Sequence, residues 1–155
     1  MKYEVVQLSA QKFAGISILT TNQDNQALKD ISNLWKQFKA NDIFEKIPDK
    51  KGNQVIALYT DYEGDYTMPY IYALGYWVTK FDYVPKDFFV KEVFPDKYAR
   101  LFAEGNFPAC IQKTWEFIWQ PEFDSTRSYH SDFECYAHDF DPNRTVSIPL
   151  YISIK

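Results

Sequence analysis

Alternating hydrophobic and polar positions recur along the chain and predict eight strands. In the first half the alternation covers 3–8, 12–19, 54–62 and 70–79. In the second half it covers 88–94, 97–103, 132–137 and 145–154. Two segments instead repeat their apolar residues every three or four positions, which predicts amphipathic helices over 27–38 and from about 107 to 120, where Pro121 ends the second. The polar stretches 41–53, 63–69 and 122–130 are predicted as loops.

The second half of the sequence repeats the first in the same order of elements. The matching segments are Lys12-Phe13-Ala14 with Lys97-Tyr98-Ala99, Leu34-Trp35 with Ile118-Trp119, and Ile56-Ala57-Leu58-Tyr59 with Phe133-Glu134-Cys135-Tyr136. Because the matches fall at the same places of a strand-strand-helix-strand-strand scheme, they indicate an internal duplication of about 1–80 and 86–155. We therefore predict one α+β domain over 1–155, made of duplicated β-β-α-β-β halves with pseudo-twofold symmetry. Its helices cover one face of a joined antiparallel sheet, and a central ligand groove lies near the axis.

One carboxylate stands in the middle of an apolar strand, at Glu134. Strand interiors disfavour this residue, and a buried carboxylate is costly unless it is paired. The more apolar positions of the two matching strands are expected to face the helices: Ile56, Leu58, Phe133 and Cys135. The remaining positions, Glu134 included, would then line a groove on the opposite face of the sheet.

Composition narrows the classes of function. A net charge of -4 and a pI near 5.2 argue against direct nucleic-acid binding. No apolar run approaches the length of roughly 18 residues that a membrane span needs, and no signal peptide is evident. Two cysteines are too few for a disulfide framework, so we expect reduced thiols and a cytoplasmic protein. Twelve tyrosines exceed what a core alone needs, because each buried hydroxyl requires a partner.

Three segments resemble one known family. They are Phe133-Glu134-x-Tyr136 followed by a turn and Ile148-Pro149-Leu150, the helix end Trp119-Gln120-Pro121, and the aromatic strand 70–75. Together they resemble the GyrI-like, or AraC-type effector-binding, domain, and in particular its stand-alone, integron-cassette-like members. The resemblance covers nearly the whole chain. Gln120 replaces the Leu that is common in the family, and bulky Tyr76-Trp77 follows Gly75.

The resemblance implies a GyrI-like or SOUL-like fold and a protein that binds hydrophobic drugs and metabolites of cationic or amphipathic character. With no room for a helix-turn-helix, we expect a stand-alone member that forms a monomer or a weak dimer. Two alternatives stay open. One is a hydrolase of electrophilic natural products that uses Glu134 as base, and the other is a protein that interacts with gyrase or with a transcription regulator.

Glu134 is the leading candidate residue, as the counter-ion of a cationic ligand. Its structural alternative is a solvated strand carboxylate paired with Lys or Arg. The candidate walls of the pocket are Tyr59, Tyr70, Trp77, Trp119 and Tyr136. The phase of strand 70–79 is open, since either Tyr70, Tyr72 and Tyr76 or Ile71, Gly75 and Trp77 face the groove.

The remaining reactive side chains support weaker hypotheses. His130, His138 and Cys135 lie near Glu134 in the sequence, which is compatible with acid–base or thiol chemistry, but two surface histidines are the simpler interpretation. Their spacing does not match a structural zinc site. We expect no metal ion and no cofactor.

Overall fold

The computed structural model describes all 155 residues and contains every predicted strand and both predicted helices. The first half comprises β1 (Glu4–Leu8), β2 (Gln11–Thr20), η1 (Gln23–Asn25), α1 (Gln26–Ala40), α2 (Ile43–Lys46), β3 (Val55–Thr60) and β4 (Tyr70–Val78). The second half comprises β5 (Phe89–Val93), β6 (Asp96–Asn106), α3 (Ala109–Ile118), α4 (Pro121–Asp124), β7 (Ser131–Tyr136) and β8 (Thr145–Ser153). The short helices α2 and α4 lie in segments that were predicted as loops.

All eight strands form one antiparallel sheet in the order β1-β6-β8-β7-β3-β4-β2-β5. The order is unchanged when β1 to β4 are exchanged with β5 to β8 and the sheet is read backwards. The predicted pseudo-twofold arrangement is therefore confirmed, and its axis passes between β3 and β7. Ala57 pairs directly with Glu134 across these two strands. Because the repeat also equates these two residues, the axis passes between them.

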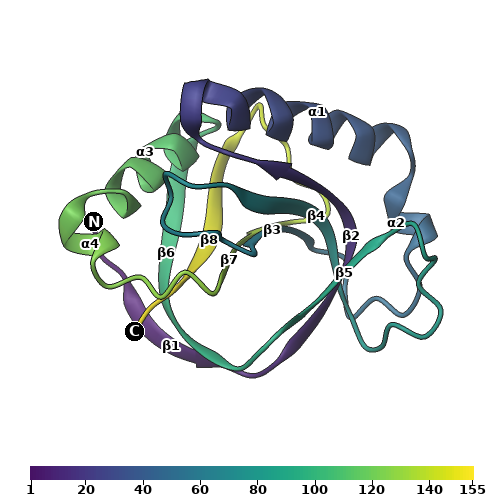
Figure 1. Cartoon of the computed structure of the whole chain (residues 1–155). Helices are drawn as coiled ribbons and strands as arrows, with labels where there is room; N and C mark the ends of the chain where they lie inside the picture. Colours follow the sequence, from purple (N-terminus) through teal and green to yellow (C-terminus); the bar gives the residue numbers. More distant parts are fainter.

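The sheet is strongly curled, because its two edges are tied together by short connections. β1 and β2 lie toward opposite ends of the strand order, yet only Ser9 and Ala10 join them. Phe94 and Pro95 make the corresponding connection from β5 to β6. Two residues reach only about 10 Å, so the edges must approach each other (Figure 1).

The sheet is buried on both faces. The larger cluster fills the space between the sheet and α1 and α3, which Figure 1 shows on the same side of the sheet. Leu34 and Phe38 of α1 and Ile111, Trp115 and Ile118 of α3 belong to this cluster, as the helical spacing predicts. The smaller cluster lies on the other face and contains Phe13, Ile56, Leu58, Ala73, Val93, Tyr98, Phe133 and Cys135.

The predicted assignment of the two strand faces is wrong. Ile56, Leu58, Phe133 and Cys135 belong to the smaller cluster and face away from the helices. Ala57 and Tyr136 belong to the cluster under the helices, and the side chain of Glu134 bonds to Trp115 of α3. The groove near the axis therefore lies on the helix-bearing face, between α1 and α3.

Two paired glycines let β2 and β4 approach closely in the first half. Gly15 lies opposite Gly75. A Cβ atom on Gly15 would lie 2.1 Å from the carbonyl oxygen of Leu74, and one on Gly75 would lie 2.1 Å from that of Ala14. No side chain larger than hydrogen fits at either position. The equivalent pair in the second half, Arg100 opposite Tyr151, carries full side chains, so the two halves differ here.

Candidate functional site

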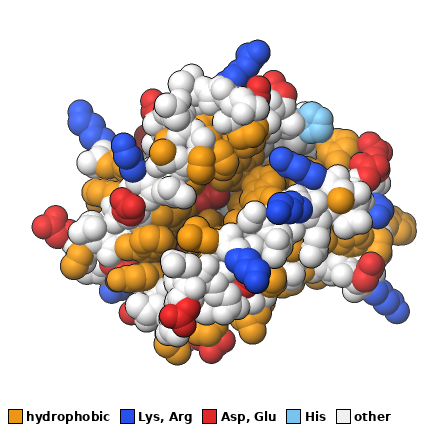
Figure 2. All heavy atoms as spheres, turned by 90° about the horizontal axis from the view of Figure 1, so that it is seen from above, with side chains coloured by type: hydrophobic (Ala, Val, Ile, Leu, Met, Phe, Trp, Pro, Cys, Tyr) orange, Lys and Arg blue, Asp and Glu red, His pale blue; other side chains and the backbone are white.

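A hollow opens on the face that carries α1 and α3. Figure 2 shows hydrophobic side chains gathered around it and an acidic side chain deep within. Glu134 lies on this face of β7, next to the pseudo-twofold axis, and is only 2 % exposed. We call the space above Glu134, between α1 and α3, the axial hollow.

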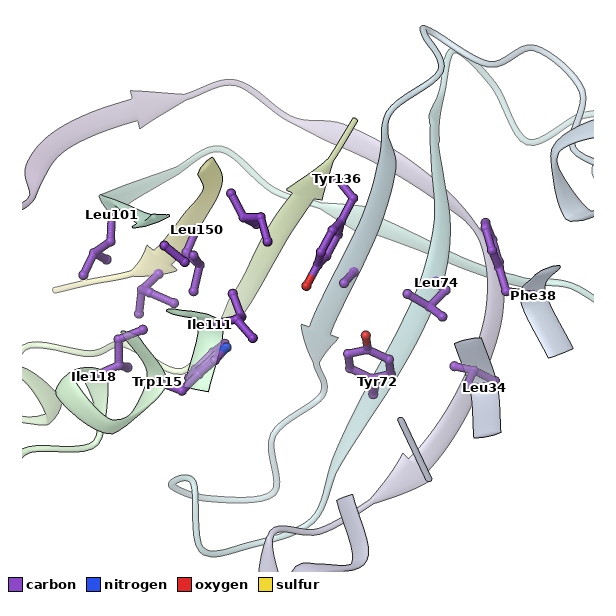
Figure 3. Packing of buried hydrophobic residues seen from close by; sticks show 14 of the residues in the cluster. Leu34, Phe38, Tyr72, Leu74, Leu101, Ile111, Trp115, Ile118, Tyr136 and Leu150 are labelled. Atoms are coloured by element: carbon purple, nitrogen blue, oxygen red, sulfur yellow. The ribbon is translucent and has the colours of Figure 1, made fainter. Parts of the chain in front are cut away.

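Three neutral donors hold the Glu134 carboxylate. The Tyr59 hydroxyl and the Trp115 indole N–H donate to Oε2, at 2.8 and 2.7 Å. The Tyr136 hydroxyl donates to Oε1, at 2.8 Å. Figure 3 shows the indole nitrogen of Trp115 and the hydroxyls of Tyr136 and Tyr72 directed into the same space. The three donors to the carboxylate come from three different elements: Tyr59 from β3, Tyr136 from β7 and Trp115 from α3.

No basic side chain compensates this carboxylate, since Glu134 takes part in no ion pair. Burial raises the pKa of the Glu134 carboxyl, while the hydrogen bonds from Trp115, Tyr136 and Tyr59 oppose that rise. Burial, followed by the nearby charge of Glu134, raises the pKa values of Tyr59 and Tyr136 well above that of free tyrosine. Both phenols therefore stay neutral and act as donors.

The same strand offers a direct contrast at Asp132, two residues before Glu134. This fully buried carboxylate accepts from Arg127 at 2.8 Å, from the Tyr62 hydroxyl at 2.6 Å and from the backbone N–H of Ser153 at 2.7 Å. Burial lowers the pKa of Arg127, but the charges of Asp132, Tyr62 and Tyr129 and the hydrogen bond to Asp132 together outweigh that effect, so the net shift is upward. Asp132 thus has the cationic partner that Glu134 lacks.

Arg127 lies close to the axial hollow but forms no ion pair with Glu134. Its guanidinium carbon lies 5.9 Å from the centroid of the Trp115 ring and 4.1 Å from that of Tyr129. Its ion pairs are with Asp132 and Asp124. The guanidinium of Arg127 is therefore already neutralised by Asp132 and Asp124.

Of the predicted wall residues, Tyr59 and Tyr136 contact Glu134 directly. Tyr70 lies on the same face, with its ring 5.9 Å from that of Tyr59, and its hydroxyl donates to Asn22. Trp119 lies further out, against Trp115 at 6.1 Å and stacked on Tyr66 at 5.9 Å. These two residues form a second layer around the axial hollow.

Trp77 is not part of this site. It packs on the opposite face of the sheet, 5.1 Å from Phe133 and 6.1 Å from Phe13 between ring centroids. The open question on strand 70–79 is thereby answered. Tyr70, Tyr72 and Tyr76 belong to the cluster under the helices, and Trp77 packs against the other one.

Sequence reasoning did not include two tryptophans of this site, Trp115 and Trp35, among the candidate residues. Trp115 lies on the sheet-facing stripe of α3, and a buried indole N–H requires an acceptor, which Glu134 supplies. Trp35 of α1 donates to the Tyr72 hydroxyl at 2.9 Å, and its ring meets that of Tyr136 at 5.1 Å. The pairing of a helix Trp with a buried strand carboxylate is the signal that could have identified Trp115.

The other reactive side chains do not join Glu134. Cys135 faces the smaller cluster, and burial followed by the charge of Glu134 raises the pKa of its thiol to about 12. His130 is exposed and bonds to Asp96, and the ring of His138 lies against Phe44. No cluster of three or more His, Cys, Asp or Glu residues is arranged to hold a metal ion.

Two further cavities, of about 250 and 480 Å³, lie near Ala137 and Asp139. They are open to solvent and lined in part by the turn between β7 and β8, and neither contains Glu134. We consider the axial hollow the stronger candidate, because it contains a buried carboxylate without a basic partner, and these two cavities do not. No helix of the structure is both long enough and apolar enough to cross a membrane.

The fold and the site can be set beside known proteins. Residues 4–154 match the family model Cass2, described as integron-associated effector binding protein. A protein of Bacillus subtilis (strain 168), named "Putative transcriptional regulator protein YobU", is 25% identical over 154 residues, which are 97% of this chain and 96% of that protein.

Two solved structures share the fold. The structure of SAV2435 bound to tetraphenylphosphonium has a TM-score of 0.81 at 18% identity, covering 100% of this chain and 94% of that one. The integron cassette protein of Vibrio cholerae, VCH_CASS2, has a TM-score of 0.76 at 23% identity, covering 99% of this chain and 95% of that one. The resemblance that the Phe133-Glu134-x-Tyr136 segment suggested is confirmed, and the chain belongs to the Cass2 family of integron-associated effector binding proteins.

Proposed function

We propose that this protein binds hydrophobic organic cations in the axial hollow, with the Glu134 carboxylate as their counter-charge. The observation that carries the proposal is a 2 %-exposed carboxylate whose hydrogen-bond partners are all neutral. A buried charge without an opposite charge is unfavourable. A cation that enters the hollow supplies the partner that no side chain of the chain provides.

The surroundings of Glu134 favour an apolar cation over a small inorganic one. Tyr59, Trp115, Tyr136 and Trp35 present aromatic rings around the carboxylate. A cation close to such a ring gains roughly 0.5–2 kcal/mol from the electrons of the ring face. The aromatic groups also accept the apolar surface of the ligand, which leaves water as it binds.

The hydrogen bonds of Glu134 favour a cation without N–H donors. A carboxylate has about four acceptor positions, and three donors already occupy Glu134. A quaternary or phosphonium ion approaches by charge alone and leaves these three bonds in place. A primary ammonium ion brings three donors of its own, for which little acceptor capacity remains.

The comparisons support the proposal without deciding the ligand. The family description specifies effector binding, and the structural neighbour SAV2435 is described with bound tetraphenylphosphonium, a hydrophobic cation that has no N–H group. The identity to that neighbour is 18%, so its ligand is a guide to the choice of probe.

Two ions of nearly the same shape and opposite charge test the proposal. Tetraphenylphosphonium and tetraphenylborate each present four phenyl groups around a charged centre. We expect isothermal titration calorimetry to show that the phosphonium binds at least about tenfold more tightly than the borate, a difference of about 1.4 kcal/mol. Equal affinities, or tighter binding of the borate, would contradict a role for the negative charge.

A further inference from the structure

Two aromatic pairs surround the Glu134 carboxylate, and each combines a strand tyrosine with a helix tryptophan. In the first pair the rings of Tyr136 of β7 and Trp35 of α1 are 5.1 Å apart, at an angle of 78°. In the second pair the rings of Tyr59 of β3 and Trp115 of α3 are 4.7 Å apart, at an angle of 50°. We call these pairs the first wall and the second wall of the axial hollow.

The internal repeat relates the tyrosines of the two walls, so these tyrosines lie on opposite sides of the axis. Tyr59 and Tyr136 occupy equivalent positions, each two residues beyond the axial residue of its own strand. Their hydroxyls donate to different oxygens of Glu134, Oε2 and Oε1. Trp35 corresponds in the repeat to Trp119, one helical turn beyond the tryptophan of the second wall. The charge therefore stands between two aromatic surfaces rather than at the end of one.

We propose that the axial hollow selects organic cations that carry their charge between two aromatic arms, with one arm against each wall. The inference rests on the proposed function and adds the shape of the ligand to it. When the central charge meets Glu134, one arm packs on Trp35 and Tyr136 and the other on Trp115 and Tyr59. Each arm then adds about two- to tenfold in affinity through its aromatic contacts.

A cation with its charge at one end cannot use both walls. Once its charge is near Glu134, its rings follow one another away from the carboxylate on a single side. They reach one wall, or they extend out of the hollow into water. The number of rings is unchanged, but the contact with the second wall is lost.

Two isomeric cations separate these cases in the unchanged protein. Dibenzyldimethylammonium carries its charge between two phenyl rings, whereas 4-benzyl-N,N,N-trimethylanilinium contains the same atoms, the same charge and two phenyl rings but carries the charge at one end. We expect the central-charge isomer to bind about two- to tenfold more tightly in calorimetric titrations. Equal affinities, or a preference for the end-charged isomer, would overturn the inference.

Removing one wall gives an independent test. The Trp35→Leu variant should weaken binding of dibenzyldimethylammonium by about two- to tenfold. Binding of benzyltrimethylammonium, which has one arm and can turn to the second wall, should weaken by no more than about twofold, the statistical factor for one wall of two. An equal loss of affinity for both ligands would contradict the inference, because it would show that a one-armed cation does not use the second wall in place of the first. Trp35 also donates a hydrogen bond to the Tyr72 hydroxyl, and both Leu and Phe at this position remove that bond. Trp35→Phe keeps a ring in the first wall, so it is the matched control for the loss of the hydrogen bond alone.

The Glu134→Gln variant separates failure of this inference from failure of the proposed function. If both isomers bind equally well to the unchanged protein and both weaken in the variant, the counter-charge stands and the two-wall selection fails. If neither isomer depends on Glu134, the proposed function itself is wrong.

Discussion

The Glu134→Gln substitution removes the charge of the axial hollow and preserves almost all of its shape. The Gln side chain can still accept hydrogen bonds from Trp115 and Tyr59 through its amide oxygen. Its NH2 group then faces the hydroxyl of Tyr136, which can turn to accept. The variant thus tests the charge and leaves the packing nearly unchanged.

The size of the effect follows from the position of the charge. The centre of a tetraphenylphosphonium ion remains roughly 5 Å from the carboxylate, since phenyl groups surround it, and at an effective dielectric constant of about 20 the attraction is about 3 kcal/mol. Lost hydration of both ions offsets part of this energy. We therefore expect a loss of about 1.4–3 kcal/mol in binding free energy, which corresponds to about 10- to 100-fold in affinity.

The measurement is a calorimetric titration of tetraphenylphosphonium into the unchanged protein, into Glu134→Gln and into Glu104→Gln. Glu104 is an exposed strand residue without an ion pair, so its substitution makes the same change in net charge away from the site. The control should bind like the unchanged protein. An affinity of Glu134→Gln within about twofold of that protein would refute the counter-charge, because it leaves less than about 0.5 kcal/mol for the electrostatic attraction.

Three further predictions concern stability. Burial raises the pKa of Glu134, so the contribution of this residue to stability is complete below the pKa of the unfolded chain and is lost as the pH rises through the folded pKa. In thermal scans, Glu134→Gln should therefore raise the melting temperature at pH 7 and have little effect near about pH 3. Arg127→Met leaves a buried carboxylate unpaired and should cost about 3–5 kcal/mol in urea denaturation, whereas Lys91→Met, which breaks an exposed pair, should cost less than about 1 kcal/mol; similar losses would contradict this account. Gly15→Ala places a methyl group 2.1 Å from a backbone oxygen and should cost at least about 1–3 kcal/mol, while Gly52→Ala, with nothing within 4 Å, should be nearly neutral in the same assay.

Local patterns were sufficient to predict the eight strands, the two longer helices and their order along the chain. The alternation of Ile56, Leu58 and Tyr59 and the helical spacing of Leu34 and Phe38 each reflect neighbours within one element. The repeat then supplied the pseudo-twofold arrangement, because equivalent segments fold alike. The same reasoning predicted that Tyr59 and Glu134 line one groove, because they share a face of matching strands, and the two residues are hydrogen-bonded.

Local patterns could not assign the two faces of the sheet. The prediction placed the more apolar positions, such as Ile56 and Leu58, beneath the helices. The curled sheet encloses a second apolar cluster on its other face, so both faces are buried and apolarity does not distinguish them. Trp77 was misplaced for the same reason, and Trp115 was missed because its contact with Glu134 depends on how α3 lies across the sheet.

The direct pairing of Ala57 with Glu134 has a consequence for how such a site can arise. In a chain with two identical halves, the residue beside the axis would face its own copy. Two alanines tolerate this, but two glutamates would carry their carboxylates on side chains whose Cβ atoms are only about 4.5–5.5 Å apart, and one carboxyl would have to stay protonated. A duplicated scaffold can therefore hold a single full charge at its centre only after the two copies have diverged at this position. The most symmetric point of the molecule is thus the one where a single central charge requires the symmetry to be broken.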